Sequence, residues 1–433
     1  MTSARAGDGG ALARNATWLA VGRVGSHLFA VVLTVVLARG MGTAGFGQYA
    51  FLSAVVVIGN VITTFGTESL LVREIAARRG DPARLLTAAL VLQLTLSAAV
   101  VAFVAAGAGW LPGRTGPVVT ALRIYVLSLF PLAFNSVFSA ALRGWERMDL
   151  YASFNVVTSA LQAAAALAAV RARAGVPALV LWLLLAQIAA AVLGRLLCGV
   201  ARPGFAFAGG AAPAAITNLF QRAWPFALLA GLAIVGQRIG VLLLGLLAGD
   251  APAGWFAAAA RVVEGLKLVH YAFLGALLPL ASRVVAQGAS GGDAGVQAAH
   301  QRLAGLVRRS RLVLLALGVG AAVAASALAT PIVTLLYGSA YHPAIEALRI
   351  LAWGLLPLAA TAPTSLALVT TGHERVVLRA AGAAVLVTTG LGLWLIPRLG
   401  VNGACAAVLA GEALLSALLL FETSRIAASR RRE

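Results

Sequence analysis

The chain has 433 residues, of which 61% are hydrophobic and 11% charged, whereas soluble domains carry roughly 25% charged residues. This balance excludes a soluble globular protein, because apolar runs of about twenty residues recur along the whole chain, and such runs are typical of membrane-spanning helices. The net charge of +19 does not indicate nucleic-acid binding, since the basic residues are scattered between apolar runs and form no stripe. We therefore predict an all-α, polytopic membrane protein.

The first half begins with a helix that carries Arg23 and His27 in its interior, followed by a Gly-rich turn at 39–45. We predict six spans in this half, at about 16–37, 46–70, 85–107, 119–142, 150–170 and 178–199. The Ala/Gly/Pro-rich stretch that follows is typical of a linker. These patterns predict an N-terminal six-helix bundle at 1–200 and a linker at 201–222.

The second half, predicted as a bundle at 223–433, contains the longest polar loop, at 283–311. Its six spans are predicted at about 223–248, 253–281, 312–337, 345–370, 376–397 and 401–423. With twelve spans, most of the 33 basic residues lie on the same side as both termini. By the positive-inside rule, both termini are expected to be cytoplasmic.

A repeated stretch relates the two halves. Residues 121–124 read Ala-Leu-Arg-Ile and are followed by Pro131-Leu-Ala and then, after an apolar run, by Gly-x-Glu-Arg at 144–147. The same signals recur in order from residue 347, with Pro357 at the equivalent position. Copies that cross a bilayer in the same direction are separated by an even number of crossings, which predicts a parallel repeat. Each copy is predicted to form one membrane helix that bends at its proline.

Ionisable residues within the predicted spans are the candidates for function, because each costs at least about 2.5–3.5 kcal/mol at membrane depth. Arginine binds phosphate groups through its planar fork of donors, so a cationic cavity wall would suit an anionic cargo. The predicted substrate-binding residues are Arg23, His27, Arg238, Arg261 and Lys267, and the predicted coupling or ion-pair residues are Glu68, Glu264 and His270.

Structural roles are the alternative for each of these residues. Arg261 and Glu264 would neutralise each other, Lys267 would extend to the membrane surface, and Arg23 would lie near the cytoplasmic edge. The two histidines would be hydrogen-bonded structural residues, and Glu68 would form an ion pair at the cytoplasmic edge.

No pattern in the sequence indicates an enzyme or a cofactor. It contains no phosphate-binding Gly-Lys-Ser/Thr loop, no metal-ligand spacing and no long outward loop that could hold a catalytic site. Cys198 and Cys405 are isolated and predict neither a disulfide nor a metal site.

Several loose motifs recur along the chain. One is the opening Ala-Arg-Gly-Met-Gly at 38–42. The others lie at 47–50, 65–67, 73–76, 224–226, 254–261, 336–341, 372–373 and 396–404. Together these motifs resemble those of the polysaccharide exporters of the multidrug/oligosaccharidyl-lipid/polysaccharide (MOP) superfamily, in particular the Wzx-type O-antigen flippases. One departure concerns the seventh helix, where members often have an Asp near the position of Gln237-Arg238. This difference puts inherited cation coupling in doubt and makes an anion contact at Arg238 more plausible.

The resemblance implies a MATE-like V of two six-helix bundles, related by a pseudo-two-fold axis, around a central cavity. It also implies alternating access that moves a polyprenyl-diphosphate-linked oligosaccharide from the cytoplasmic to the outer leaflet of a bacterial inner membrane. The implied partners are this lipid-linked sugar and membrane lipids, with polysaccharide polymerase or chain-length proteins as candidates, around a monomeric transport unit.

Other functions remain open at this stage. A lipid II flippase would suit the cationic cavity equally, although that group usually has fourteen spans. A MATE-type multidrug exporter fits less well, because a positively charged cavity repels cationic drugs. A polymerase or ligase of lipid-linked sugars needs a larger outward loop. A structural membrane component of polysaccharide assembly is the remaining alternative.

Overall fold

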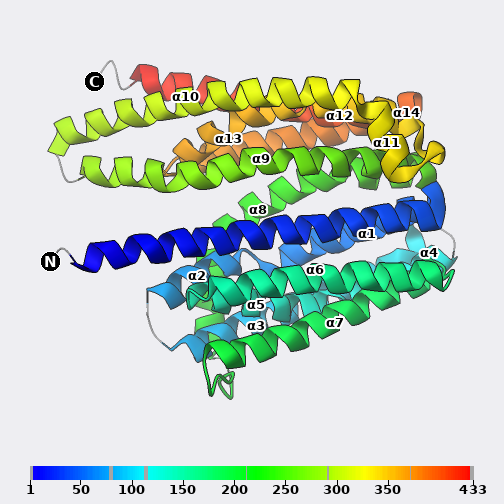
Figure 1. Cartoon of the computed structure of the whole chain (residues 1–433), viewed down its shortest axis with the longest axis horizontal. Helices are drawn as coiled ribbons and strands as arrows, with labels where there is room; N and C mark the ends of the chain where they lie inside the picture. The colour runs from blue at the N-terminus through cyan, green and yellow to red at the C-terminus, as the bar shows by residue number, and fades with distance from the viewer. Residues whose placement is uncertain are drawn as a thin grey trace. The chain divides into compact units, whose positions relative to one another are not determined.

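The computed structural model describes residues 3–77, 81–111, 116–210, 212–289, 292–370 and 372–429 (Figure 1). Within these ranges the regular elements are all helices, which confirms the predicted all-α class. The chain divides into two compact units, unit 1 (Met1–Ile234) and unit 2 (Val235–Glu433). The predicted bundle and linker boundaries at 200, 201 and 222 stay a prediction.

Unit 1 is built around α5, which contacts α2, α3 and α7, while α1 packs along α6 (Figure 1). Its elements are α1 (Ser3–Thr64), α2 (Thr67–Ala76), α3 (Pro82–Gly107), the 3-10 turn η1 (Ala108–Trp110), α4 (Gly116–Val126), α5 (Leu129–Gly144), α6 (Met148–Arg171), α7 (Val176–Ala201) and the first part of α8 (Pro213–Leu247).

Small residues allow α1 to approach α6 closely. A Cβ atom added at Gly22 would lie 2.8 Å from the Cβ of Ala152, and one added at Gly25 would lie 2.9 Å from Cγ2 of Val156. Helices in a membrane gain little from the hydrophobic effect against each other, so close contact of this kind supplies much of their association. The glycine spacing of three residues therefore sets the face of α1 that packs on α6.

The segment between α7 and α8 packs against the core of unit 1. Phe205 contacts Trp145 edge-on, with ring centroids 5.3 Å apart, and Phe207 lies 6.0 Å from the Phe138 ring. The backbone N–H of Ala208 donates to Oγ1 of Thr87 at 2.9 Å. This part of the stretch predicted as a linker is thus held by aromatic contacts and a hydrogen bond.

Unit 2 has α9 packed on α10 and α12, and α13 on α10 and α14 (Figure 1). Besides the end of α8, its elements are α9 (Asp250–Ala289), α10 (Gly292–Ala327), α11 (Ala329–Tyr337), the 3-10 turn η2 (Ser339–Tyr341), α12 (Pro343–Ala352), α13 (Leu355–Thr370) and α14 (Glu374–Ser429). The prediction of a polar loop at 283–311 was wrong, because α9 and α10 continue as helices through nearly all of this stretch. Residues 290–291 lie outside the described ranges.

Nine helices of the described residues are long and apolar enough to cross a membrane. Two of these, in α1 and α14, each consist of two helices, because the chain turns at Gly42 (φ 68°) and Gly400 (φ 55°), where glycine adopts positive φ without strain. Counting α1 and α14 twice gives eleven candidate spans among the described residues. The remaining predicted span, at 253–281, lies in α9, which is helical but is not among the nine.

The repeated stretch forms one candidate span in each unit, as predicted, and the helix of each span is interrupted for two residues shortly before its proline. In unit 1 the break separates α4 from α5, and in unit 2 it separates α12 from α13. A proline ring collides with the carbonyl four residues before it, and that residue is Leu127 for Pro131 and Trp353 for Pro357. The break falls at these two residues.

The hydrogen bonds at the two breaks have the same pattern. The N–H of Leu127 donates to the carbonyl of Ile124, three residues back, at 3.2 Å. The N–H of Trp353 donates to the carbonyl of Ile350, also three residues back, at 3.2 Å. The repeat in sequence is therefore a repeat in local structure.

Candidate functional site

The predicted site residues are divided between the units. Arg23 and His27 lie on α1 in unit 1, where the Arg23 side chain is exposed and His27 is half-buried. Arg23 follows Gly22, which packs on α6, so the guanidinium lies on the neighbouring exposed face of the helix. Glu68 also belongs to unit 1, whereas Arg238, Arg261, Glu264, Lys267 and His270 belong to unit 2.

Two arginines of unit 2 share one carboxylate. Nη1 of Arg238, on α8, lies 3.2 Å from Oε1 of Glu264, and Nη1 of Arg261 lies 2.8 Å from Oε2 of the same side chain. Arg261 and Glu264 are three residues apart on α9, which places them on neighbouring parts of one face. The neutralisation that we considered as an alternative for this pair is present, and Arg238 adds a second cation to it.

Lys267 pairs with a carboxylate from a distant helix. Its Nζ lies 2.9 Å from Oε1 of Glu412 on α14, and the two side chains are 16% and 30% exposed. The Glu412 carboxylate also lies against Gly354, at the break between α12 and α13, where a Cβ would collide with it. Lys267 thus extends to an ion pair and not to the membrane surface.

The charge cluster of unit 2 consists of Arg238, Arg261, Glu264, Lys267 and Glu412. Three cations and two carboxylates leave one excess positive charge. The predicted cationic wall is therefore largely compensated by carboxylates from within the same unit. An anionic ligand would have to compete with Glu264 for the two guanidinium groups.

His270 is placed in the interior of unit 2. Its side chain is 1% exposed, and Nε2 faces Gly318 of α10, where a Cβ would lie 3.5 Å away. Among the described residues, no group of three His, Cys, Asp or Glu side chains could hold a metal ion.

Glu68 forms an ion pair in unit 1. Its Oε1 accepts from Nη1 of Arg143 at 2.8 Å, and both side chains are more than one third exposed. Arg143 lies in the last turn of α5, and Glu68 lies in the first turn of α2, so the pair joins two helices that also pack together. The expected ion pair of Glu68 is present.

Glu68 also lines a polar cavity of unit 1 that the sequence analysis missed. The cavity has a volume of about 420 Å³ and is lined by side chains of α1, α2, α5, α6, α7 and α8. Its polar lining is Asn60, Thr64, Glu68, Ser69, Asn135, Ser136, Ser139, Asn155, Thr158, Gln162 and Gln187. The signal was available, because Asn155, Thr158 and Gln162 follow helical spacing along α6 and share one face.

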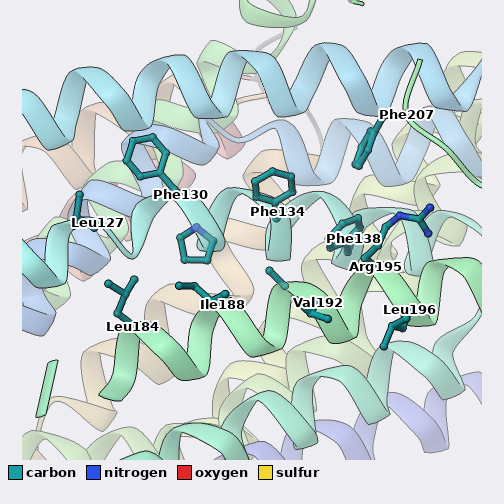
Figure 2. A pocket seen from close by; sticks show the side chains of 12 residues that line it. Leu127, Phe130, Phe134, Phe138, Leu184, Ile188, Val192, Arg195, Leu196 and Phe207 are labelled. Atoms are coloured by element: carbon teal, nitrogen blue, oxygen red, sulfur yellow. The ribbon is translucent and has the colours of Figure 1, made fainter. Parts of the chain in front are cut away.

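A second cavity of unit 1, of about 690 Å³, is almost entirely apolar (Figure 2). Phe130, Phe134 and Phe138 project into it from α5, opposite aliphatic side chains of α7, and Phe207 lies at one end (Figure 2). Arg195 lies beside this end, donates from Nη2 to the Phe205 carbonyl at 2.9 Å and covers the Phe205 ring. The lining suits hydrocarbon chains of lipids.

Comparison with known families gives one match. Residues 12–285 match the model of the family described as polysaccharide biosynthesis protein. No curated protein sequence matches the chain.

Solved structures of transporters share the fold. One is an inward-facing multidrug resistance MATE family transporter of the MOP superfamily, with a TM-score of 0.74, 16% identity, and coverage of 94% of this chain and 96% of that one. Another is the lipid II flippase MurJ in an inward closed conformation, with a TM-score of 0.72, 11% identity, and coverage of 94% and 87%. A third, a MOP superfamily transporter from Pyrococcus furiosus described as having a binding pocket of reverse polarity, has a TM-score of 0.66, 17% identity, and coverage of 96% of both chains.

Proposed function

Because this chain belongs to the polysaccharide biosynthesis protein family and has the fold of MOP superfamily transporters, we propose that it is a lipid-linked oligosaccharide flippase. Its cargo would be a polyprenyl-diphosphate-linked oligosaccharide, carried from the cytoplasmic to the outer leaflet by alternating access. The observation that carries the proposal is the family match over 12–285 in a chain that folds throughout as a transporter. A hydrated protein path is needed, because a charged, hydroxylated head group crosses hydrocarbon only at prohibitive cost.

The proposal assigns the diphosphate to the charge cluster of unit 2. Arg238 and Arg261 would exchange part of their bonding to Glu264 for phosphate oxygens, and Lys267 would contribute its charge nearby. Guanidinium groups favour this exchange, because they form paired hydrogen bonds with phosphate as readily as with carboxylate. Arg23 and His27 stay candidates for contact with the same head group.

The cellular setting follows from the same proposal. The protein would act as a monomeric transport unit in a bacterial inner membrane, with both termini cytoplasmic, next to membrane lipids and to polymerase or chain-length proteins. It would be a transporter and not an enzyme, and it would need no cofactor.

Flipping in proteoliposomes tests the proposal. A fluorescent polyprenyl-diphosphate-linked oligosaccharide is reconstituted with the protein, and its exposure to a membrane-impermeant quencher is followed. Wild-type protein should accelerate flipping over protein-free vesicles. Arg238→Ala should slow it about 10- to 140-fold, since hydrogen bonds to charged groups contribute about 1.5–3 kcal/mol. Flipping no faster than in protein-free vesicles would refute the function.

A matched control separates the site from general charge effects. Arg398 of α14 is exposed, donates to the Trp394 carbonyl at 2.6 Å and takes no part in the charge cluster. Arg398→Ala removes the same charge and should leave the flipping rate unchanged. Equal rates for Arg238→Ala and wild type would remove Arg238 from the mechanism.

Energetic coupling is tested by imposing H⁺ and Na⁺ gradients separately across the same vesicles. Glu68, Glu264 and His270 stay candidates for coupling. A gradient dependence that disappears in Glu68→Gln would assign coupling to the ion pair with Arg143. Dependence that persists in this variant would leave Glu68 with a structural role.

The second candidate function is a lipid II flippase, favoured by the similarity of the fold to MurJ. The flipping assay distinguishes the two when lipid II replaces the oligosaccharide lipid. Preferential flipping of lipid II would select this second function.

A further inference from the structure

We propose that the polar cavity of unit 1 binds an uncharged sugar ring of the cargo, through hydrogen bonds to its hydroxyl groups. This inference rests on the proposed function and adds a subsite to it. It assigns sugar recognition to unit 1, whereas the diphosphate is assigned to the charge cluster of unit 2.

The first argument is the presence of unsatisfied polar atoms. Oδ1 of Asn60, Oδ1 of Asn135, Oγ of Ser136 and Oγ1 of Thr158 are buried and have no hydrogen-bond partner among the described residues. All four belong to side chains that line this cavity. A buried polar atom left unpaired costs about 1–3 kcal/mol, so the cavity is built to hold a polar occupant.

The side chain of Asn135 is held in a fixed orientation. Its side chain is only 8% exposed, and its Nδ2 donates to Oε1 of Gln187 on α7 at 3.0 Å. That hydrogen bond fixes the amide, and the amide oxygen remains without a protein partner in the cavity lining. The oxygen therefore keeps an unused capacity to accept a hydrogen bond at the edge of the cavity.

The lining selects the charge of the ligand. Among the described residues, no lysine or arginine lines the cavity, so a phosphate group would find no cation in the lining and would lie near the Glu68 carboxylate. A cation is disfavoured as well, because Glu68 already pairs with Arg143 at 2.8 Å. An uncharged ligand fits best.

The free groups also select hydroxyls over other neutral groups. Two amide oxygens only accept hydrogen bonds, whereas the Ser136 and Thr158 hydroxyls can both donate and accept. A polyol presents both functions on every hydroxyl and can satisfy all four atoms. A volume of about 420 Å³ is within the usual range for small-molecule sites.

Binding to protein in detergent tests the subsite. The probes are polyprenyl diphosphate without sugar and the same lipid bearing glucose, galactose or N-acetylglucosamine. For wild-type protein, at least one sugar should tighten binding relative to the bare diphosphate. The double variant Ser136→Ala/Thr158→Val should lose about 10- to 30-fold of that gain, as two hydrogen bonds are removed.

The variant distinguishes ligand binding from a structural role. The two hydroxyls have no protein partner, so their removal should leave the thermal unfolding temperature unchanged or slightly raised. The control Ser97→Ala/Thr34→Val removes two buried hydroxyls of the same unit that lie outside the cavity and donate to backbone carbonyls. It should retain the full gain in affinity from the sugar.

Each outcome decides a different point. If no sugar tightens binding, or if the gain survives in Ser136→Ala/Thr158→Val, the subsite is refuted and the cavity holds water only. In that case, binding of bare polyprenyl diphosphate would still support the proposed function. If none of the four lipids binds, both proposals fail.

Discussion

The ion pair between Lys267 and Glu412 gives the sharpest test of the structure of unit 2. Nζ and Oε1 are 2.9 Å apart, and the lysine side chain is only 16% exposed. Removing one partner of a fully buried pair costs about 3–5 kcal/mol, because the remaining charge loses its compensation. Since Glu412 keeps some exposure, we expect Lys267→Met to cost about 2–3 kcal/mol of unfolding free energy.

The double variant isolates the pair. Lys267→Met/Glu412→Leu replaces both charges with apolar groups, so its stability should return to within about 1 kcal/mol of wild type. The control Arg425→Gln breaks the exposed pair with Glu422 on α14, whose nitrogen and oxygen are 3.4 Å apart. It should cost less than about 1 kcal/mol, because exposed pairs are screened by solvent.

The two cysteines provide the assay, because each reports on one unit. Cys198 in unit 1 and Cys405 in unit 2 are both 0% exposed. In the Cys198→Ala background, a maleimide reagent labels Cys405 only when unit 2 opens. When closing is faster than labelling, the rate follows the equilibrium of opening, so a loss of 2–3 kcal/mol raises it about 30- to 140-fold.

Labelling of Cys198 in the Cys405→Ala background should stay unchanged for Lys267→Met, because the ion pair lies within unit 2. A rise of less than about threefold at Cys405 would refute the reasoning. So would a double variant that labels as fast as Lys267→Met, since the cost would then not come from an unpaired charge.

Two further predictions concern unit 1 and use labelling of Cys198. Gly22→Ala should destabilise the unit by about 1–3 kcal/mol, because the new methyl group collides with α6. The control Gly107→Ala meets no atom within 4 Å and should be neutral or stabilising, so equal labelling of the two variants would contradict the contact. Phe205→Ala should cost about 3–5 kcal/mol of unfolding free energy, because Phe205 is only 8% exposed. The control Phe103→Ala, at a residue that is 81% exposed, should cost much less, and a neutral Phe205→Ala would show that the segment before α8 is not packed.

Hydropathy and glycine predicted most of the fold, because the bilayer imposes helices on apolar runs and positive φ selects glycine at tight turns. The polar residues at 283–311 led to the wrong prediction of a loop, because α9 and α10 continue into this stretch. A polar stretch can remain helical outside hydrocarbon when its residues favour helix, so loss of hydropathy does not mark a helix end. The prolines at 131 and 357 predicted the two distortions, which lie four residues earlier because the proline ring collides with the carbonyl there.

The candidate site was less predictable than the fold. The Arg261 and Glu264 pair follows from their spacing on one helix. In contrast, Glu412 and Lys267 are 145 residues apart in the sequence, and no local pattern predicts their contact. The polar cavity was missed for a different reason. Ionisable residues stand out in an apolar sequence, whereas Asn135 and Thr158 are neutral residues that cost less to bury and leave a weaker signal.

The contrast between the two sites bears on release of the cargo in the proposed cycle. A transporter that binds its cargo too tightly releases it too slowly. The protein groups that contact the cargo therefore need other partners when the cargo leaves. In the proposed cycle Glu264 would provide this offset for the diphosphate, because its carboxylate, which pairs with Arg238 and Arg261, would return to them as the phosphate departs. In the polar cavity, neutral hydrogen bonds of about 0.5–1.5 kcal/mol each are exchanged for bonds to water. Replacing Glu264 with Gln should therefore tighten binding of polyprenyl diphosphate while slowing its flipping, and weaker binding in this variant would contradict the exchange.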